Sequence, residues 1–84
     1  MITVFAYPSS ADHDADRNGV ELRDARDPNE LANIISGRED KQTYLDYKDE
    51  KGTPLNLIEA MAYLGAVYDA VAEMFYYDGH PVLF

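Results

Sequence analysis

The chain lacks cysteine altogether and has few basic residues. Its 84 residues carry 16 Asp and Glu side chains against 7 Lys and Arg, which gives a net charge of −9. Without cysteine there is no disulfide and no thiolate metal ligand, so we expect a fold that packing alone stabilises, in the reducing cytoplasm. The surplus of carboxylates repels nucleic acid and anionic membranes and favours encounter with basic protein surfaces. We therefore expect neither nucleic acid nor a membrane as a direct partner.

Long apolar runs and catalytic motifs are also missing. No apolar stretch of the chain approaches the roughly 18 to 20 residues that cross a bilayer, and the first ten residues lack the pattern of a targeting signal. The sequence contains no nucleophile elbow, no phosphate-binding glycine loop and no zinc-ligand spacing, and His13 and His80 lie far apart. We expect no catalysis, no cofactor and no metal.

The residues that are present favour a folded domain. Hydrophobic residues make up 46% of the chain and include seven Tyr and three Phe, which is too many core-forming side chains for a disordered polypeptide. A chain of this length supports one compact core, so we expect a single domain over residues 1–84.

The first half of the chain predicts two strands and a short helix. Residues 2–7 (ITVFAY) are typical of a central strand, and residues 8–19 of a loop that closes in a tight Asn18-Gly19 turn. Residues 20–24 alternate apolar and charged side chains, which predicts a strand with one wet face. In the sequence DPNELANIISG, an Asp cap, a first-turn proline and a final glycine predict a helix over residues 28–36.

The second half predicts one more strand and a long helix. Residues 38–41 are a charged turn, and residues 42–48 alternate as a third strand. A second cap-and-proline pair, Thr53-Pro54, opens a helix that ends near Tyr77 and is about 36 Å long. The tail over residues 80–84 predicts a short last strand. The expected fold is therefore α+β: a small antiparallel sheet of three or four strands with one short helix and one long C-terminal helix packed on it.

The apolar arc of this expected helix is wide for so small a sheet to cover. Its main stripe includes Leu57, Met61, Leu64 and Phe75, and further apolar residues flank it. A homodimer through the long helix would cover the excess, so we keep that possibility open. Gly65 in mid-helix suggests that another backbone passes close to it.

The stretch DHDADRNG, residues 12–19, has the spacing of a calcium loop. Asp14, Asp16, Asn18 and Gly19 match the opening of an EF-hand loop, but its twelfth position is Ala25 instead of the bidentate Glu. A turn built from Asp and Asn explains the same residues. A calcium-binding domain that uses this loop stays as an alternative.

Carboxylates without matching bases occur in three tracts, on the 12–16 loop, around the end of the third strand, and on the long helix. Tyrosines lie near them and suit an interface with amphipathic rings. On a helix, Asp69 and Glu73 would stand about 6 Å apart, comparable to the spacing of phosphates that a basic groove accepts. We predict that these residues contact a basic partner: Asp12, Asp14, Asp16, Tyr44, Asp46, Asp49, Glu50, Glu59, Tyr63, Asp69, Glu73 and Tyr77.

In size, acidity and lack of cysteine or catalytic motif, the chain resembles the small phage-encoded anti-CRISPR and anti-restriction proteins, several of which are DNA mimics. The resemblance implies an inhibitor, acting in the host cytoplasm, that blocks a basic surface of a nucleic-acid-handling protein. Four of the seven bases lie within residues 38–51 and dilute the charge below that of duplex DNA, so blockade of one subunit fits better than imitation of a long duplex. The remaining alternative is a homodimeric accessory protein whose acidity only keeps it soluble.

Overall fold

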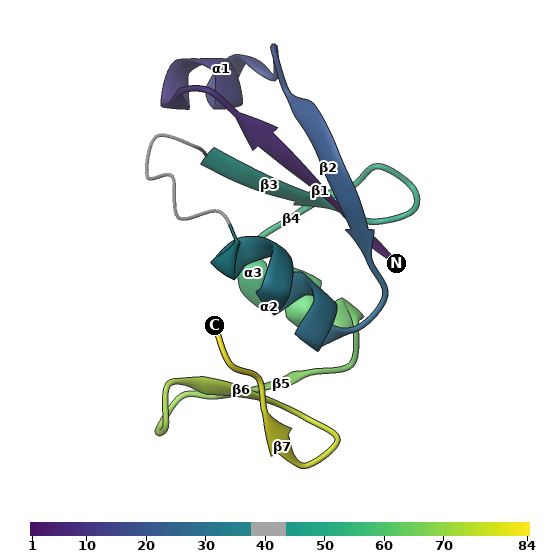
Figure 1. Cartoon of the computed structure of the whole chain (residues 1–84), viewed down its shortest axis with the longest axis vertical. Helices are drawn as coiled ribbons and strands as arrows, with labels where there is room; N and C mark the ends of the chain where they lie inside the picture. Colours follow the sequence, from purple (N-terminus) through teal and green to yellow (C-terminus); the bar gives the residue numbers. More distant parts are fainter. Residues whose placement is uncertain (38–43) are drawn as a thin grey trace.

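The computed structural model describes residues 1–37 and 44–84 (Figure 1). Its larger sheet has four antiparallel strands in the order β2-β1-β3-β4. These strands are β1 (Ile2–Tyr7), β2 (Val20–Ala25), β3 (Tyr44–Lys48) and β4 (Pro54–Leu55). The expected α+β class and antiparallel sheet of three or four strands are therefore confirmed, but its fourth strand is Pro54–Leu55 instead of the chain's last residues.

Strand β1 is central in this sheet, as predicted. It pairs with β2 on one side and β3 on the other, and Val4 lies opposite Arg23 and Tyr47. Ile2 and Val4 are fully buried, while the residues that alternate with them, Thr3 and Phe5, are half-buried on the opposite face. Alternate side chains of a strand point to opposite faces, so the strand places its aliphatic residues in the core and leaves one ring partly open.

The short helix α2 (Pro28–Ser36) has the bounds that the sequence predicts. The Asp27 carboxylate accepts a hydrogen bond from the Glu30 amide at 2.9 Å, and Pro28 occupies the first turn, where its missing N–H is not needed. The helix packs on β2 and buries Leu31 and Ile34. Strand β2 also lies where expected, although Val20 at its start remains exposed.

The prediction of a loop over residues 8–19 was wrong in its first part, because residues Ser10–Ala15 form helix α1. Ser9 caps this helix by accepting from the Asp12 amide at 3.1 Å, and Asp16 ends it with a left-handed backbone (φ 51°). Asp and Asn tolerate that conformation better than most residues. The same serine and acidic residues that indicate a loop thus supply both ends of one short helix.

The prediction of a long C-terminal helix was also wrong. Helix α3 covers only Leu57–Tyr63, and its N-cap is Asn56, because Pro54 and Leu55 belong to β4. Gly65 follows with φ +103°, a backbone that no α-helix contains. Beyond it lies a second antiparallel sheet in the order β5-β6-β7, made of β5 (Val67–Asp69), β6 (Met74–Tyr77) and β7 (His80–Pro81).

Local chemistry explains this second sheet. Val67, Tyr68 and the run from Phe75 to Tyr77 are β-branched or aromatic and favour strands. The Asp69 carboxylate accepts from the amides of Val71 and Ala72, at 3.0 and 3.2 Å, and so forms the turn between β5 and β6. Asp78 and Gly79, both with positive φ, turn the chain into β7. The expected last strand therefore exists, but it is shorter than residues 80–84.

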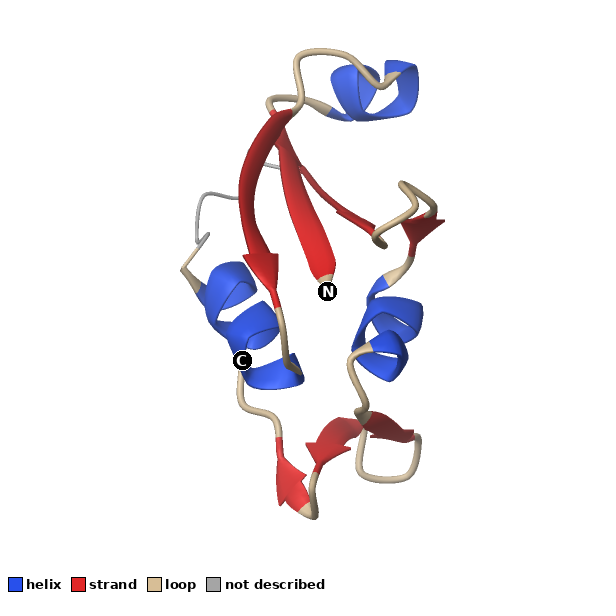
Figure 2. Cartoon of the chain, turned by 90° about the vertical axis from the view of Figure 1, so that its right-hand side faces the viewer, coloured by secondary structure: helices blue, strands red, loops and turns tan. Residues whose placement is uncertain are grey.

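The third strand begins at Tyr44, inside the predicted range of 42–48; the charged turn over 38–41 and residues 42–43 lie outside the described residues. Helices α2 and α3 lie between the two sheets along the long axis of a molecule of 37 × 27 × 20 Å (Figures 1 and 2). One hydrophobic cluster joins both sheets and the two helices, with Ile2, Leu31, Met61, Phe75 and Val82 among its members. In the part of the chain that the structure describes, no helix is long and apolar enough to cross a membrane.

Candidate functional site

Three side chains fasten helix α1 to the sheet. Tyr7 is 2% exposed, and its hydroxyl donates to the Asp16 carboxylate at 2.6 Å. The Lys48 ammonium lies 3.8 Å from the same carboxylate and 4.8 Å from the centre of the Phe5 ring. Gly19 passes so close to Tyr7 that a methyl group on it would come within 2.7 Å of the ring. The cluster joins the turn after α1 to β1 and β3.

The protonation of this cluster follows from its contacts. The hydrogen bond to Asp16, together with burial and the nearby carboxylates of Asp16 and Asp46, raises the pKa of Tyr7 to about 12. The same hydrogen bond and the Lys48 ammonium lower the pKa of Asp16. Tyr7 is then a neutral donor and Asp16 an anion at neutral pH, so neither group is poised to transfer a proton there. We interpret the cluster as a structural tether.

The other carboxylates of α1 also serve this local structure. Asp12 accepts from the Ser9 hydroxyl at 2.9 Å and from Arg17 and Asn18 at 3.1 Å each, and these three donors lower the pKa of Asp12. Asp14 lies 3.6 Å from His13 and is 83% exposed. Of the residues with the spacing of a calcium loop, Asp14 thus lies on helix α1 and Asp16 ends it, whereas Asn18 and Gly19 follow it. Within residues 1–37 and 44–84, no three Asp, Glu or His side chains gather as metal ligands.

The second predicted tract follows β3. Asp46 accepts from the Tyr47 amide at 3.1 Å, and Asp49 accepts from the amides of Lys51 and Thr53 at 2.9 Å each. Those backbone donors lower the pKa of Asp49. Glu50 lies 2.7 Å from the terminal ammonium of Met1. Tyr44, 45% exposed, lies opposite Tyr7 in the sheet.

The third predicted tract is divided between α3 and the second sheet. Glu59 forms a capping box with Asn56, in which each side chain bonds the backbone of the other at 2.8 and 3.1 Å. Tyr63, one turn later, is 49% exposed. Asp69 and Glu73 flank the turn between β5 and β6, so the helical spacing expected for them does not exist. Tyr77 is half-buried on β6.

The three tracts do not form one contiguous surface. Helix α1 lies at one end of the long axis and the β5–β6 turn at the other, with α3 and the loop after β3 between them (Figure 1). The first two tracts come close together at Tyr7, whose pKa both Asp16 and Asp46 raise. The predicted contact residues are therefore distributed along the molecule. Among their carboxylates, Glu59 caps a helix and Asp49 and Asp69 close turns.

A feature that the sequence did not reveal is the apolar surface at the C-terminal end. Residues 54–84 carry four carboxylates and no Lys or Arg. Most of the exposed large apolar side chains of the described residues lie in this same region: Ile58, Tyr63, Val67, Tyr68, Val71, Leu83 and Phe84. The excess of apolar residues over what one small sheet covers was the available signal, but we assigned it to a long helix. The folded chain exposes it on β5, the turn between β5 and β6, α3 and the C-terminal residues.

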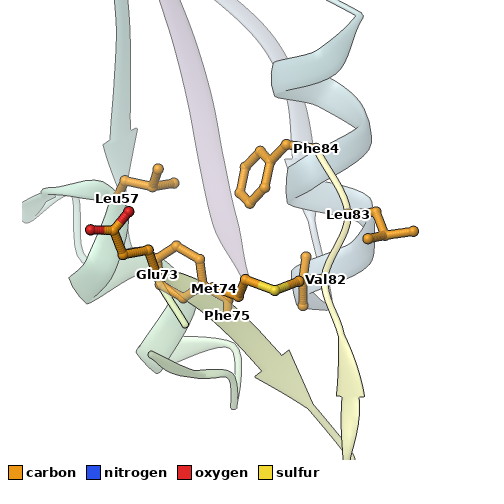
Figure 3. Close-up of a pocket in the computed structure, with 7 residues that line it drawn as sticks. All are labelled: Leu57, Glu73, Met74, Phe75, Val82, Leu83 and Phe84. Atoms are coloured by element: carbon orange, nitrogen blue, oxygen red, sulfur yellow. The ribbon is translucent and has the colours of Figure 1, made fainter. Parts of the chain in front are cut away.

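A cavity of about 370 Å³ opens in this apolar region (Figure 3). Phe75 and Val82, both nearly buried, contribute to its wall, and Phe84 turns its ring toward them with a Phe75–Phe84 centroid distance of 6.2 Å. Glu73 is the one charged residue among those that line it, and its carboxylate lies beside Leu57 (Figure 3). The remaining lining residues are Met74 and Leu83.

Comparison of the chain with protein-family models, with curated proteins and with solved structures finds no match.

Proposed function

We propose that the protein is an inhibitor that binds a basic surface of a nucleic-acid-handling protein and blocks it by steric and electrostatic occlusion, without turnover. The observation that supports this most directly is the composition of the C-terminal surface, where exposed apolar side chains occur with four carboxylates and no Lys or Arg. Protein interfaces combine apolar and aromatic anchors with a polar rim that sets the choice of partner. Here the rim carries charge of one sign.

The charge of the whole chain supports the same proposal. A net charge of −9 raises the rate of encounter with a cationic surface and repels nucleic acid, which would otherwise occupy that surface. Basic grooves that accept phosphates are built for a dense array of negative charge. An acidic protein of this size competes for such a groove by exclusion, and no catalytic group is required.

The order of the carboxylates adds to this support. The carboxylates of Asp12 and Asp49 each accept at least two hydrogen bonds from neighbouring residues, and the Glu59 carboxylate accepts one from the Asn56 amide. A charge held in place loses less side-chain freedom on binding than a mobile one. The local hydrogen bonds therefore do not compete with a binding role, since the carboxylates remain at the surface and no charged side chain among the described residues is buried.

The test is capture of partners followed by a competition assay. Immobilised protein should retain basic proteins from a lysate in about 0.05 M salt and release most of them in about 0.5 M salt, where exposed charges are screened beyond roughly 4 Å. Each retained protein is then purified and tested for nucleic-acid binding by gel shift. We expect the chain to abolish that binding in a concentration-dependent way. Retained proteins that bind nucleic acid equally well with and without the chain would refute the proposal.

A further inference from the structure

We propose that the cavity beside Glu73 receives an arginine side chain of the partner, with the guanidinium at the Glu73 carboxylate and the stem along the apolar wall of the cavity. This inference rests on the proposed function and names the contact through which it is achieved. The predicted acidic tracts then contribute long-range attraction, while this cavity supplies the specific anchor.

The shape and lining of the cavity favour a side chain with an apolar stem. Its volume of about 370 Å³ lies at the lower end of the range for sites that hold small ligands, roughly 300 to 1,000 Å³. Six of its seven lining residues are apolar. Phe75 and Val82 are supported by the hydrophobic core, whereas Phe84 is 56% exposed. An inserted stem would cover apolar surface that is now open to water.

Charge selects the head group of the occupant. Glu73 has no ion-pair partner among the described residues, and residues 54–84 contain no Lys or Arg that would neutralise it. A second copy of the chain would bring another net charge of −9 to the same place, so charge disfavours a self-complex. An anionic ligand is disfavoured for the same reason. A cation is the occupant whose charge complements this wall.

The aromatic wall favours arginine over lysine. The planar guanidinium stacks on aromatic faces and pairs with a carboxylate through two parallel hydrogen bonds, while an ammonium is a more strongly hydrated point charge. In this wall the ring centroids of Phe75 and Phe84 lie 6.2 Å apart and the rings are tilted by 49°. Arginine is also among the residues enriched at the centres of protein interfaces.

Glu73 stands at its position at some cost in stability. Its φ of +54° is in the left-handed region, which glycine or asparagine adopts with less strain. The Asp69 carboxylate forms the turn by accepting hydrogen bonds from the amides of Val71 and Ala72. The turn therefore does not need the Glu73 carboxylate. A binding role accounts for a charge that local structure does not use.

Three probes of similar length test this assignment: butylguanidinium, pentanol and pentanoate. Binding is followed by the NMR shifts of the methyl groups of Leu57, Met74 and Val82. We expect butylguanidinium to bind with a Kd on the order of 10 mM, as a ligand of so few atoms allows. Pentanoate should cause no saturable shift. Equal binding of all three probes, or no binding of butylguanidinium, would overturn the proposal.

A matched pair of variants locates the charge that matters. Glu73→Gln should weaken butylguanidinium binding by about fivefold, the upper value for a partly exposed ion pair. Asp14→Asn removes one charge at the opposite end of the molecule and should leave the binding unchanged. If both variants weaken binding equally, net charge and not this cavity is responsible, and the proposal fails.

The outcome is separable from that of the proposed function. Suppose that nucleic acid displaces a captured partner, and that this partner binds the wild type, Glu73→Gln and Phe84→Ala equally. That result leaves the inhibitor proposal intact and refutes the cavity as its anchor. If no partner is captured while the guanidinium still binds in a Glu73-dependent way, the cavity is a cation site and the inhibitor proposal fails.

Discussion

Tyr7 shows how a single residue decides the conformation of its neighbours. Its ring is covered by Gly19 and its hydroxyl is bound to Asp16, so a strand residue fixes the position of a helix that follows in the chain. Hydrogen bonds from neutral donors to carboxylates are stronger than those between neutral groups. This contact holds the end of the Asp-rich stretch against strand β1.

We predict that Tyr7→Phe lowers the free energy of unfolding by about 1.5 to 3 kcal/mol at pH 7, because it deletes a hydrogen bond to a charged group without removing the ring. The pKa of Tyr7 is raised from 10.0 to about 12, so its contribution to stability is complete below pH 10 and is lost as the pH rises to 12. The difference between wild type and variant should therefore shrink over that interval. Urea unfolding followed by circular dichroism measures it.

Asp16 provides the acidic counterpart. Its lowered pKa means that its contribution is present above its unfolded value near 3.8 and is lost as the pH falls through the folded value. In the Tyr7→Phe variant this acid-side loss should be smaller, because the main cause of the shift is gone. A difference between wild type and variant that stays constant from pH 3 to pH 12 would contradict the assigned contact.

At the scale of elements, the prediction succeeded where the signals are local. Helix α2 has its cap, its first-turn proline and its apolar positions within ten residues, and its bounds were correct. Strand β1 is nearly all apolar and was correctly placed at the centre of the sheet. Both elements depend on information that neighbouring residues carry.

The C-terminal third failed because two periodicities fit the same residues. Leu57, Met61, Leu64 and Phe75 fall on one face of a helical wheel, but Phe75 in fact reaches the core from a strand. The backbone of Gly65 and the pairing of β5 with β6 determine that these residues form strands and not a helix. That pairing is a contact between separate segments of the chain. The cavity beside Glu73 exists only after that pairing, so the sequence could not predict it.

The substitution Gly65→Ala distinguishes a continuous helix from the observed chain reversal by the sign of the change in the free energy of unfolding. In a helix interior, alanine would be more stable than glycine by about 1 kcal/mol. At φ +103°, alanine is strained, so we predict a loss of about 1 to 2 kcal/mol in the free energy of unfolding. Ala62→Gly, inside α3, serves as the control and should lose about 1 kcal/mol. If Gly65→Ala instead raised the free energy of unfolding, the result would support a continuous helix through residue 65.

For the molecule as a whole, acidity and apolar exposure have different distributions. Carboxylates extend over the full 37 Å length, whereas exposed apolar side chains concentrate at the C-terminal end. A homodimer cannot form through a long C-terminal helix as expected, since α3 ends at Tyr63. The apolar end nevertheless remains a surface through which copies could meet if their charges did not oppose it.

We therefore predict that self-association depends on salt in the direction opposite to partner capture. In about 0.01 M salt the screening length is roughly 30 Å, so two chains of charge −9 repel over most of their length and light scattering should give the 9.5 kDa of one chain. In about 1 M salt that length falls to roughly 3 Å, and the apolar ends should begin to associate.

Val71→Ser should reduce this association, because Val71 is 97% exposed in the C-terminal region. Val20→Ser, at an exposed position on β2, is the control and should not reduce it. A stable dimer in low salt would mean that like charge does not exclude a second copy, and it would remove the argument by which charge selects an arginine for the cavity.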